Sequence, residues 1–146
     1  MRLFHYKLIP YLPDKLLKQQ WGDLNALFNH PKYKHWAINY VWDYDKELLW
    51  HYAVAVKNEM VARGFGPVSY RAFNQFFDDC IHGEEIKHYD EHNIQYLQIC
   101  YNILREHYIR CDDCFTEDAW VKLENFVWGE KKKEDQSWEC SPVGKE

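Results

Sequence analysis

Hydrophobic residues recur at helical spacing in several stretches of this chain, and the first stretch is the clearest. Between residues 14 and 28 the apolar side chains return every three or four residues, which is typical of an amphipathic α-helix. They are Leu16, Leu17, Trp21, Leu24, Leu27 and Phe28. Pro13 suits the first position of this helix, where the missing N–H is not needed, and His30–Pro31 ends it. The segment from Pro10 to Pro13 is predicted to be extended.

The same spacing predicts four more helices, each preceded by a residue whose side chain can accept hydrogen bonds from the first N–H groups of a helix. A glycine follows three of them, and glycine permits the left-handed conformation that often ends a helix. The predicted caps are Asp45, Ser69, Asp90 and Thr116, and the predicted ends are Gly64, Gly83 and Gly129. The apolar stretch 37–42 fits a short strand, a buried connector or a short helix.

These patterns predict an all-α fold, a compact single-domain bundle of about five helices over residues 1–128. Residues 129–146 are charge-dense and lack periodicity, so we expect a mobile C-terminal tail. No apolar run approaches the roughly 20 residues that a membrane-spanning helix needs, so no membrane partner is expected. The charged, proline-interrupted start also lacks the apolar stretch of a signal peptide, which predicts a cytoplasmic protein.

The cysteines indicate neither a disulfide framework nor a metal site. Their number, five, is odd, and reduced thiols are expected in the absence of a secretion signal. Cys111 and Cys114 have the spacing of half a zinc site, but no second Cys-x-x-Cys completes it. His88 and His92 are four residues apart but straddle the predicted cap at Asp90. We therefore expect no metal and no cofactor.

The net charge of −5 counts against nucleic acid as a partner, because neutralisation of phosphates supplies much of that affinity. The charges are unevenly distributed, however. Residues 1–40 hold six Lys and Arg against two acids, a balance of +4, whereas residues 41–146 have a balance of −9. A polyanion would therefore bind through the N-terminal third of the chain.

The chemistry that the sequence offers is concentrated around its first residue. An α-amine has a pKa near 8, so about a tenth of such groups are unprotonated nucleophiles at neutral pH. Attack on a sugar aldehyde carbon forms an imine, and a nearby carboxylate can steady the cationic intermediate and accept a proton. Met1 supplies the amine and Asp23 the carboxylate, while Arg2 is suited to hold a phosphate and His5 to shuttle a proton. The alternatives are a solvated Asp23 and a structural hydrogen bond at His5.

Residues 30–36, His-Pro-Lys-Tyr-Lys-His-Trp, interleave cations with rings, a composition that suits phosphate contacts and base stacking. An ordinary exposed loop is the alternative. With other positions in the basic third of the chain, this segment gives a candidate nucleic-acid-binding set: Lys15, Lys18, His30, Lys32, Lys34, His35, Trp36, Asn39 and Tyr40. The expected partner is DNA or a nucleoside-containing ligand.

The start of the chain resembles the pyrimidine-dimer DNA glycosylases of the endonuclease V type. In a gapless alignment from the first residue, Asp23 falls on the catalytic Glu of that family, and tripeptides 44–46 and 63–65 resemble segments that bracket its second helix. Leu12, Asp14, Leu17 and Leu24 are identical. A bacterial branch is closer still and shares Met-Arg-Leu-aromatic-His, Tyr11-Leu12-Pro13, Gln20-Trp21, Asn39-Tyr40-Val41 and Tyr96-Leu97-x-x-Cys100-x-x-Asn102. The resemblance covers roughly residues 1–110.

The resemblance implies a DNA glycosylase and AP lyase that acts on damaged or modified bases through an imine of the N-terminal amine, with Asp23 as the acid/base. The chain differs from the family at its reactive end. Arg2 is a large residue after the initiator and predicts that Met1 is retained, Asp23 is one methylene shorter than Glu, and Gly22 and Ala26 stand where the family has phosphate-binding Arg. These differences fit a substrate with fewer phosphates, or a non-catalytic binder of a nucleotide, a modified base or a protein.

Overall fold

Helices form the regular structure in the computed structural model, which describes residues 1–110 and 114–139. No strand occurs in these described residues, and the all-α fold expected from the sequence is confirmed. The chain divides into two compact units between His92 and Asn93, and the single domain over residues 1–128 stays a prediction. None of the described helices is both long and apolar enough to cross a membrane.

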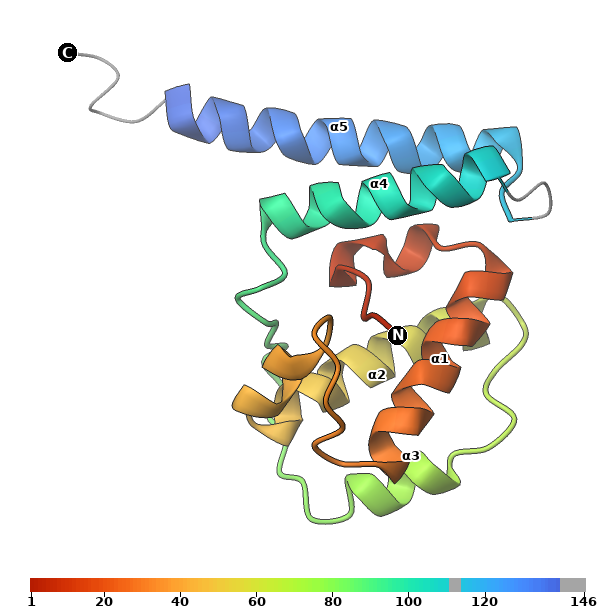
Figure 1. The fold of residues 1–146 in the computed structure, drawn as a ribbon, viewed down its shortest axis with the longest axis vertical. Coiled ribbons are helices and arrows are strands. Elements are labelled where there is room, and N and C mark those ends of the chain that lie inside the picture. Colours follow the sequence, from red (N-terminus) through yellow and green to blue (C-terminus); the bar gives the residue numbers. More distant parts are fainter. Residues whose placement is uncertain (111–113, 140–146) are drawn as a thin grey trace. The chain divides into compact units, whose positions relative to one another are not determined.

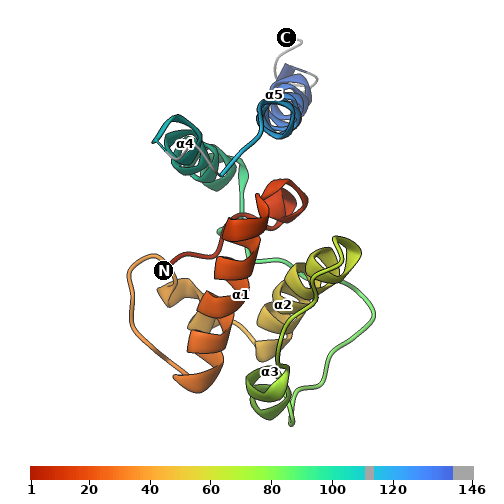
Figure 2. The same cartoon turned by 90° about the vertical axis from the view of Figure 1, so that its right-hand side faces the viewer.

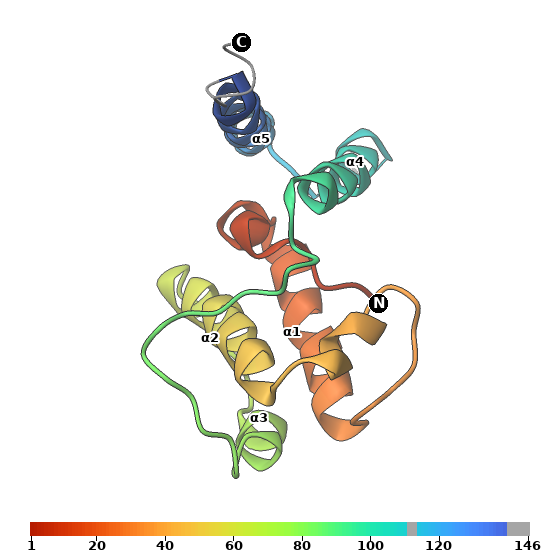
Figure 3. The same cartoon turned by 90° about the vertical axis from the view of Figure 1, so that its left-hand side faces the viewer.

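The first unit contains three α-helices and two short 3₁₀ helices (Figure 1). They are η1 (Tyr6–Tyr11), α1 (Asp14–Asn29), η2 (Asn39–Asp43), α2 (Lys46–Ala62) and α3 (Arg71–Phe76). α1 packs against both α2 and α3, and η1 packs on α2. Figures 2 and 3 show α1 and α2 side by side, with α3 below them in these views. α1 is therefore the central element of this unit.

The apolar stripe predicted for α1 forms the core of the first unit. Leu17 and Leu24 are completely buried. At the C-terminal end of α1, the ring centroid of Phe28 lies 5.4 Å from that of Phe76 and 5.1 Å from that of Phe77. Ring pairs at such distances stabilise beyond the burial of their area. These contacts hold α3 in place, because a helix of six residues is not stable by itself.

Local signals placed the limits of α1 and α2 within about a residue. Asp45 is the N-cap of α2, although its side chain makes no capping hydrogen bond. Gly64 follows α2 with a φ of 90°, the left-handed conformation expected of a glycine that ends a helix. The N-cap of α3 is Tyr70 rather than the predicted Ser69, although the Oγ of Ser69 accepts the N–H of Arg71 at 3.2 Å.

Two other boundaries predicted in the first unit are wrong. The extended segment expected from Pro10 begins only at Leu12, because η1 continues through Pro10. α3 ends at Phe76 rather than Gly83, and the following residues 77–92 contain only turns and bends. The N–H of Gly83 donates to Oε1 of Glu47 on α2 at 2.9 Å instead of ending a helix. The hydrogen bond between Gly83 and the distant residue Glu47 therefore takes the place of the helix end that the glycine predicted.

The second unit contains α4 (Ile94–Arg110) and α5 (Glu117–Glu139), which pack against each other (Figure 1). The ring of Trp120 on α5 stacks on two tyrosines of α4, with centroid distances of 5.5 Å to Tyr101 and 4.7 Å to Tyr108. The helix pair is therefore joined by a ladder of aromatic rings.

The caps of these two helices differ from the prediction in one case. Asn93 takes the place expected for Asp90, because its Oδ1 accepts the N–H of Tyr96 at 2.9 Å. Thr116 caps α5 as predicted, with its Oγ1 accepting the N–H of Ala119 at 3.1 Å.

The helix end predicted at Gly129 is wrong, because α5 continues through it to Glu139. A glycine inside a helix costs only about 1 kcal/mol relative to alanine, which is not enough to end a helix anchored by Trp120. Residues 140–146 lie outside the described residues, so the mobile tail stays a prediction there. Cys111 also lies outside them, and Cys114 is buried.

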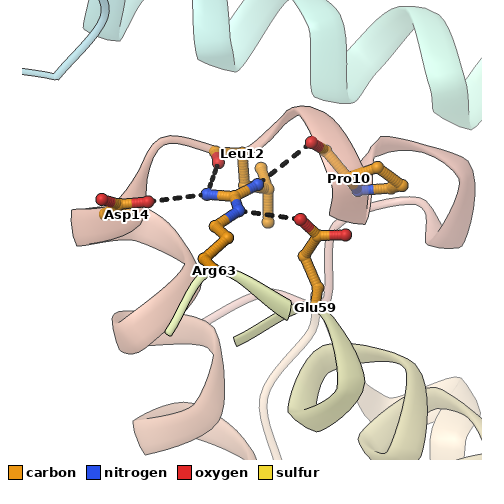
Figure 4. A network of polar contacts seen from close by, with 5 residues as sticks. All are labelled: Pro10, Leu12, Asp14, Glu59 and Arg63. Carbon is orange, nitrogen blue, oxygen red and sulfur yellow. Dashed lines mark hydrogen bonds and ion pairs between the residues drawn. The ribbon is translucent and has the colours of Figure 1, made fainter. Parts of the chain in front are cut away.

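Arg63, the residue after α2, joins that helix to the segment between η1 and α1 (Figure 4). Its guanidinium donates to the carbonyl oxygens of Leu12 at 2.6 Å and Pro10 at 3.0 Å. It also donates to the carboxylates of Glu59 at 2.8 Å and Asp14 at 2.9 Å. A planar guanidinium presents enough donors for all four acceptors, which a lysine ammonium does not.

Replacing Arg63 with methionine should lower the free energy of unfolding by about 2–4 kcal/mol, because two carbonyls and two carboxylates lose a shared donor. Urea denaturation followed by circular dichroism measures the change. Arg71→Met is the matched control, since Arg71 is exposed at the start of α3, and its effect should stay within about 0.5 kcal/mol. Equal stability of the two variants would contradict this role for Arg63.

Candidate functional site

The buried side chain of Gln20 holds the first residues of the chain against α1. Its Nε2 donates to the carbonyl oxygen of Arg2 at 2.9 Å, and its Oε1 accepts the N–H of Phe4 at 2.9 Å. The hydroxyl of Tyr52 lies 3.1 Å from the same Oε1 and 2.7 Å from the carbonyl oxygen of Phe4. Only 2% of Gln20 is exposed, so loss of any of these partners would leave a polar group unsatisfied.

The N-terminus is therefore fixed alongside α1. Leu3, between the two residues held by Gln20, is completely buried. In all three ribbon views the N-terminus lies between α1 and the loop that follows it (Figures 1, 2 and 3). Met1 itself is 37% exposed. The first residue is thus positioned by its neighbours while part of its surface remains open to solvent.

Asp23 lies three residues after Gln20, on a neighbouring position of the α1 surface. Burial raises the pKa of its carboxyl above the ordinary value, and this effect outweighs two others that lower the pKa. The two opposing effects are the positive charge of the terminal amine and a hydrogen bond from the N–H of Arg2. The structure therefore brings together the amine of Met1, the first backbone N–H and the Asp23 carboxyl.

The side chain of Arg2 reaches the loop after α1. Its guanidinium carbon lies 5.4 Å from the centre of the Trp36 ring, a cation–π distance. Trp36 is 77% exposed, a high fraction for so large an aromatic side chain. The neighbouring residue, His35, is fixed by two hydrogen bonds. Its backbone N–H donates to Oδ1 of Asn39 at 2.7 Å, and its ring Nδ1 accepts the N–H of Ala37 at 3.1 Å. A cation and an exposed indole thus lie close to the first residue.

The rest of the loop forms a defined turn. Lys32 has a φ of 66°, in the left-handed region, and the N–H of Tyr33 donates to the carbonyl oxygen of His30 at 3.0 Å. The indole N–H of Trp42 donates to the carbonyl oxygen of Tyr33 at 2.8 Å and ties the turn to η2. Lys32 and Lys34 are exposed. The loop therefore presents its cations to solvent from a fixed backbone.

Other predicted residues lie apart from this group. His5 is 2% exposed and caps η1 through its Nδ1, which accepts the N–H of Lys7 at 3.1 Å, so its contacts support the structural alternative. The ammonium of Lys18 lies 4.8 Å from the centre of the Phe65 ring, and its position is about 140° around α1 from Asp23. Lys15 and His30 are exposed at opposite ends of α1.

Tyr40 joins a buried histidine. Its hydroxyl lies 2.7 Å from Nε2 of His92, whose Nδ1 accepts the N–H of Tyr6 at 3.2 Å. The ring proton is therefore on Nε2, and the tyrosine oxygen accepts it. Burial, with smaller effects of His5 and His88, lowers the pKa of His92 to about 3 and keeps the ring neutral. The described residues contain no group of three or more potential metal ligands.

Gln20 is the residue of this site that sequence reasoning overlooked as a functional position. It falls three residues after Leu17 and four before Leu24, inside the apolar stripe of α1. A polar residue in such a stripe is buried and must find hydrogen-bond partners. The polar Gln20 within an apolar stripe is therefore the feature of the sequence that marks this position. It does not show which backbone groups the side-chain amide binds.

The first half of the chain matches a known family. Residues 1–71 match the family model of the pyrimidine dimer DNA glycosylases, and this segment includes η1, α1, the loop, η2 and α2. No curated protein and no solved structure matches the chain. The closer likeness to a bacterial branch stays a prediction. Residues 1–71, which hold Met1, Gln20 and Asp23, are therefore similar to the pyrimidine dimer DNA glycosylases.

Proposed function

We propose that this protein is a DNA glycosylase and AP lyase that acts on damaged or modified bases through the amine of Met1. One observation carries the proposal: the Asp23 carboxyl lies within reach of the charge of that amine and accepts the N–H of Arg2. A half-buried carboxyl with a raised pKa suits a group that takes up and releases a proton during a reaction. The family match supports DNA as the substrate class.

The reaction begins when the amine nitrogen attacks C1′ of a deoxyribose. At a damaged nucleotide the base departs with the bonding electrons and gains a proton, whereas at an abasic site C1′ is an aldehyde and water departs. On the first route the C1′–O4′ bond of the sugar ring then breaks as the nitrogen lone pair forms the C=N bond, and O4′ takes up a proton, so both routes give an imine between residue 1 and C1′. The Asp23 carboxylate then removes a proton from C2′, and the 3′ phosphate leaves by elimination.

Arg2 and the loop would bind the strand around the reacting sugar. The Arg2 guanidinium can neutralise a phosphate, and the exposed indole of Trp36 offers a face on which a base stacks. Lys32 and Lys34 add two exposed cations on the same loop. Three of the six Lys and Arg residues in positions 1–40 would thus bind the strand rather than take part in the chemistry.

A second function, a non-catalytic binder of a nucleotide or a modified base, has observations of its own. The chain carries a net charge of −5, and apart from the two neighbouring residues and the backbone of α1 itself, no heavy atom lies within 4 Å of where a side chain at Gly22 would begin, a position at which the family has Arg. The surface beside Asp23 therefore has space but lacks that cation. This function predicts saturable binding without turnover, and binding that Asp23→Asn leaves unchanged.

Borohydride reduction with abasic-site DNA should trap a covalent adduct at residue 1, because reduction converts an imine into a stable amine. Asp23→Asn should slow strand cleavage by about 100-fold, the usual contribution of a general base. Asp23→Glu should retain cleavage, since it keeps the carboxylate. Gel electrophoresis measures cleavage and trapping, and peptide mass mapping locates the adduct.

Asp78→Asn is the matched control for that experiment, because Asp78 is exposed and follows α3. A chain with Gly-Ser added before Met1 carries its amine roughly 7 Å further along and should give no adduct. The intact mass reports whether Met1 is retained. An adduct on a lysine, or unchanged cleavage by Asp23→Asn, would refute the assigned roles.

The raised pKa of Asp23 also predicts a pH-dependent effect of Asp23→Asn on stability. Burial disfavours the ionised carboxyl in the folded chain, so this group opposes folding above its folded-state pKa and not below the unfolded value of 3.8. The variant should therefore melt roughly 1–3 °C above the wild type at pH 7, and the difference should vanish toward pH 3. Differential scanning calorimetry measures both. A lower melting temperature at pH 7 would show that the amine and the Arg2 N–H outweigh burial.

A further inference from the structure

A cavity of about 590 Å³ lies in the first unit, between α2 and the segment 82–88. Its size is within the range of small-molecule sites in proteins. On α2 it is lined by Trp50, Val54, Ala55 and Asn58, which repeat at helical spacing along one side of the helix. Met1, Arg2, Asp23 and Trp36 do not line it. The cavity is therefore a separate site from the one proposed for imine chemistry.

Two pairs of stacked rings form part of its walls. The imidazole of His82 lies on the indole of Trp50, with centroids 3.6 Å apart and planes within 10°. The imidazole of His88 lies on the ring of Tyr6, with centroids 3.5 Å apart and planes within 3°. Each pair places a flat nitrogen heterocycle on an aromatic face. The protein's own histidines thus show the kind of ring that these walls accept.

The segment that closes the cavity is fixed to α2 at two points. Oε1 of Glu47 accepts the N–H of Gly83 at 2.9 Å, and Oε2 of the same carboxylate accepts from the ammonium of Lys87 at 3.2 Å. Glu84 and Ile86, which line the cavity, lie between these two anchors. The segment 82–88, which forms one side of the cavity, is therefore fixed to α2 by hydrogen bonds.

The charge of the lining selects against anions. No Lys or Arg lines the cavity, whereas Glu84 does. Burial is the main cause that lowers the pKa of His88, so this ring is neutral at physiological pH. The amide of Asn58 and the ring of His51 are polar groups that can bind the edge of a ligand. A phosphate would meet the Glu84 carboxylate and no Lys or Arg in this lining.

We propose that this cavity binds an uncharged nitrogen heteroaromatic ring of nucleobase or nucleoside size and rejects the same ring when it carries a phosphate. The stacked pairs supply the ring faces, and the Glu84 carboxylate, with no Lys or Arg in the lining, supplies the discrimination. The proposal is independent of the imine chemistry, because the two sites share none of the reactive residues.

Isothermal titration calorimetry of the full chain with adenosine tests the proposal. Adenosine should bind saturably, and AMP should bind at least about tenfold more weakly, because its phosphate faces the Glu84 carboxylate and no Lys or Arg. Ala55→Leu should weaken adenosine binding by about tenfold or more, since the added side chain occupies the cavity. Ala62→Leu is the matched control, an exposed alanine on the same helix that does not line the cavity, and should bind as the wild type does.

Asp23→Asn should bind adenosine with unchanged affinity, so failure of the imine chemistry and failure of this site are separate results. Circular dichroism confirms that each variant is folded before titration. Absence of saturable adenosine binding, equal affinity for AMP, or equal affinity in the folded Ala55→Leu variant would overturn the proposal.

Discussion

The buried amide of Gln20 is the interaction on which the candidate site depends. It donates to one backbone carbonyl and accepts one backbone N–H within the first four residues, much as a neighbouring strand would. These two hydrogen bonds fix the positions of the Met1 amine, the Arg2 N–H and the Arg2 side chain. An apolar residue at position 20 would leave two backbone groups without partners, so hydrophobic packing alone cannot replace the amide.

Uncharged aromatic side chains add further hydrogen bonds that support the contacts of Gln20 with the N-terminal segment. Tyr52 reinforces the Gln20 contacts, and His92 joins the N–H of Tyr6 to the hydroxyl of Tyr40. His92 serves this purpose because burial keeps it uncharged, and a charged imidazole would lose its acceptor nitrogen. The high aromatic content, 18% of the chain, is thus used partly for oriented hydrogen bonds as well as for packing.

The cations of the site come from the ends of the N-terminal segment rather than from the middle of α1. Positions 22 and 26 are Gly and Ala, whereas Arg2 lies over Trp36 and the loop exposes Lys32 and Lys34. Positive charge is therefore gathered at the first residues and the loop, in a chain that is otherwise acidic. This arrangement leaves the surface beside Asp23 open, as the space around Gly22 shows.

Local patterns in the amino-acid sequence are enough to predict the all-α fold and the limits of α1 and α2, and they lead to the hypothesis that the first residue acts together with Asp23. Caps, glycines and apolar spacing act over a few residues, so they can be found locally. Tertiary contacts determine the outcome at positions where local signals compete with distant ones: Gly83 binds Glu47 instead of ending a helix, and α5 passes through Gly129. They also determine which backbone groups Gln20 holds and where the cavity lies. Those features depend on residues far apart in the chain, whose meeting no local pattern encodes.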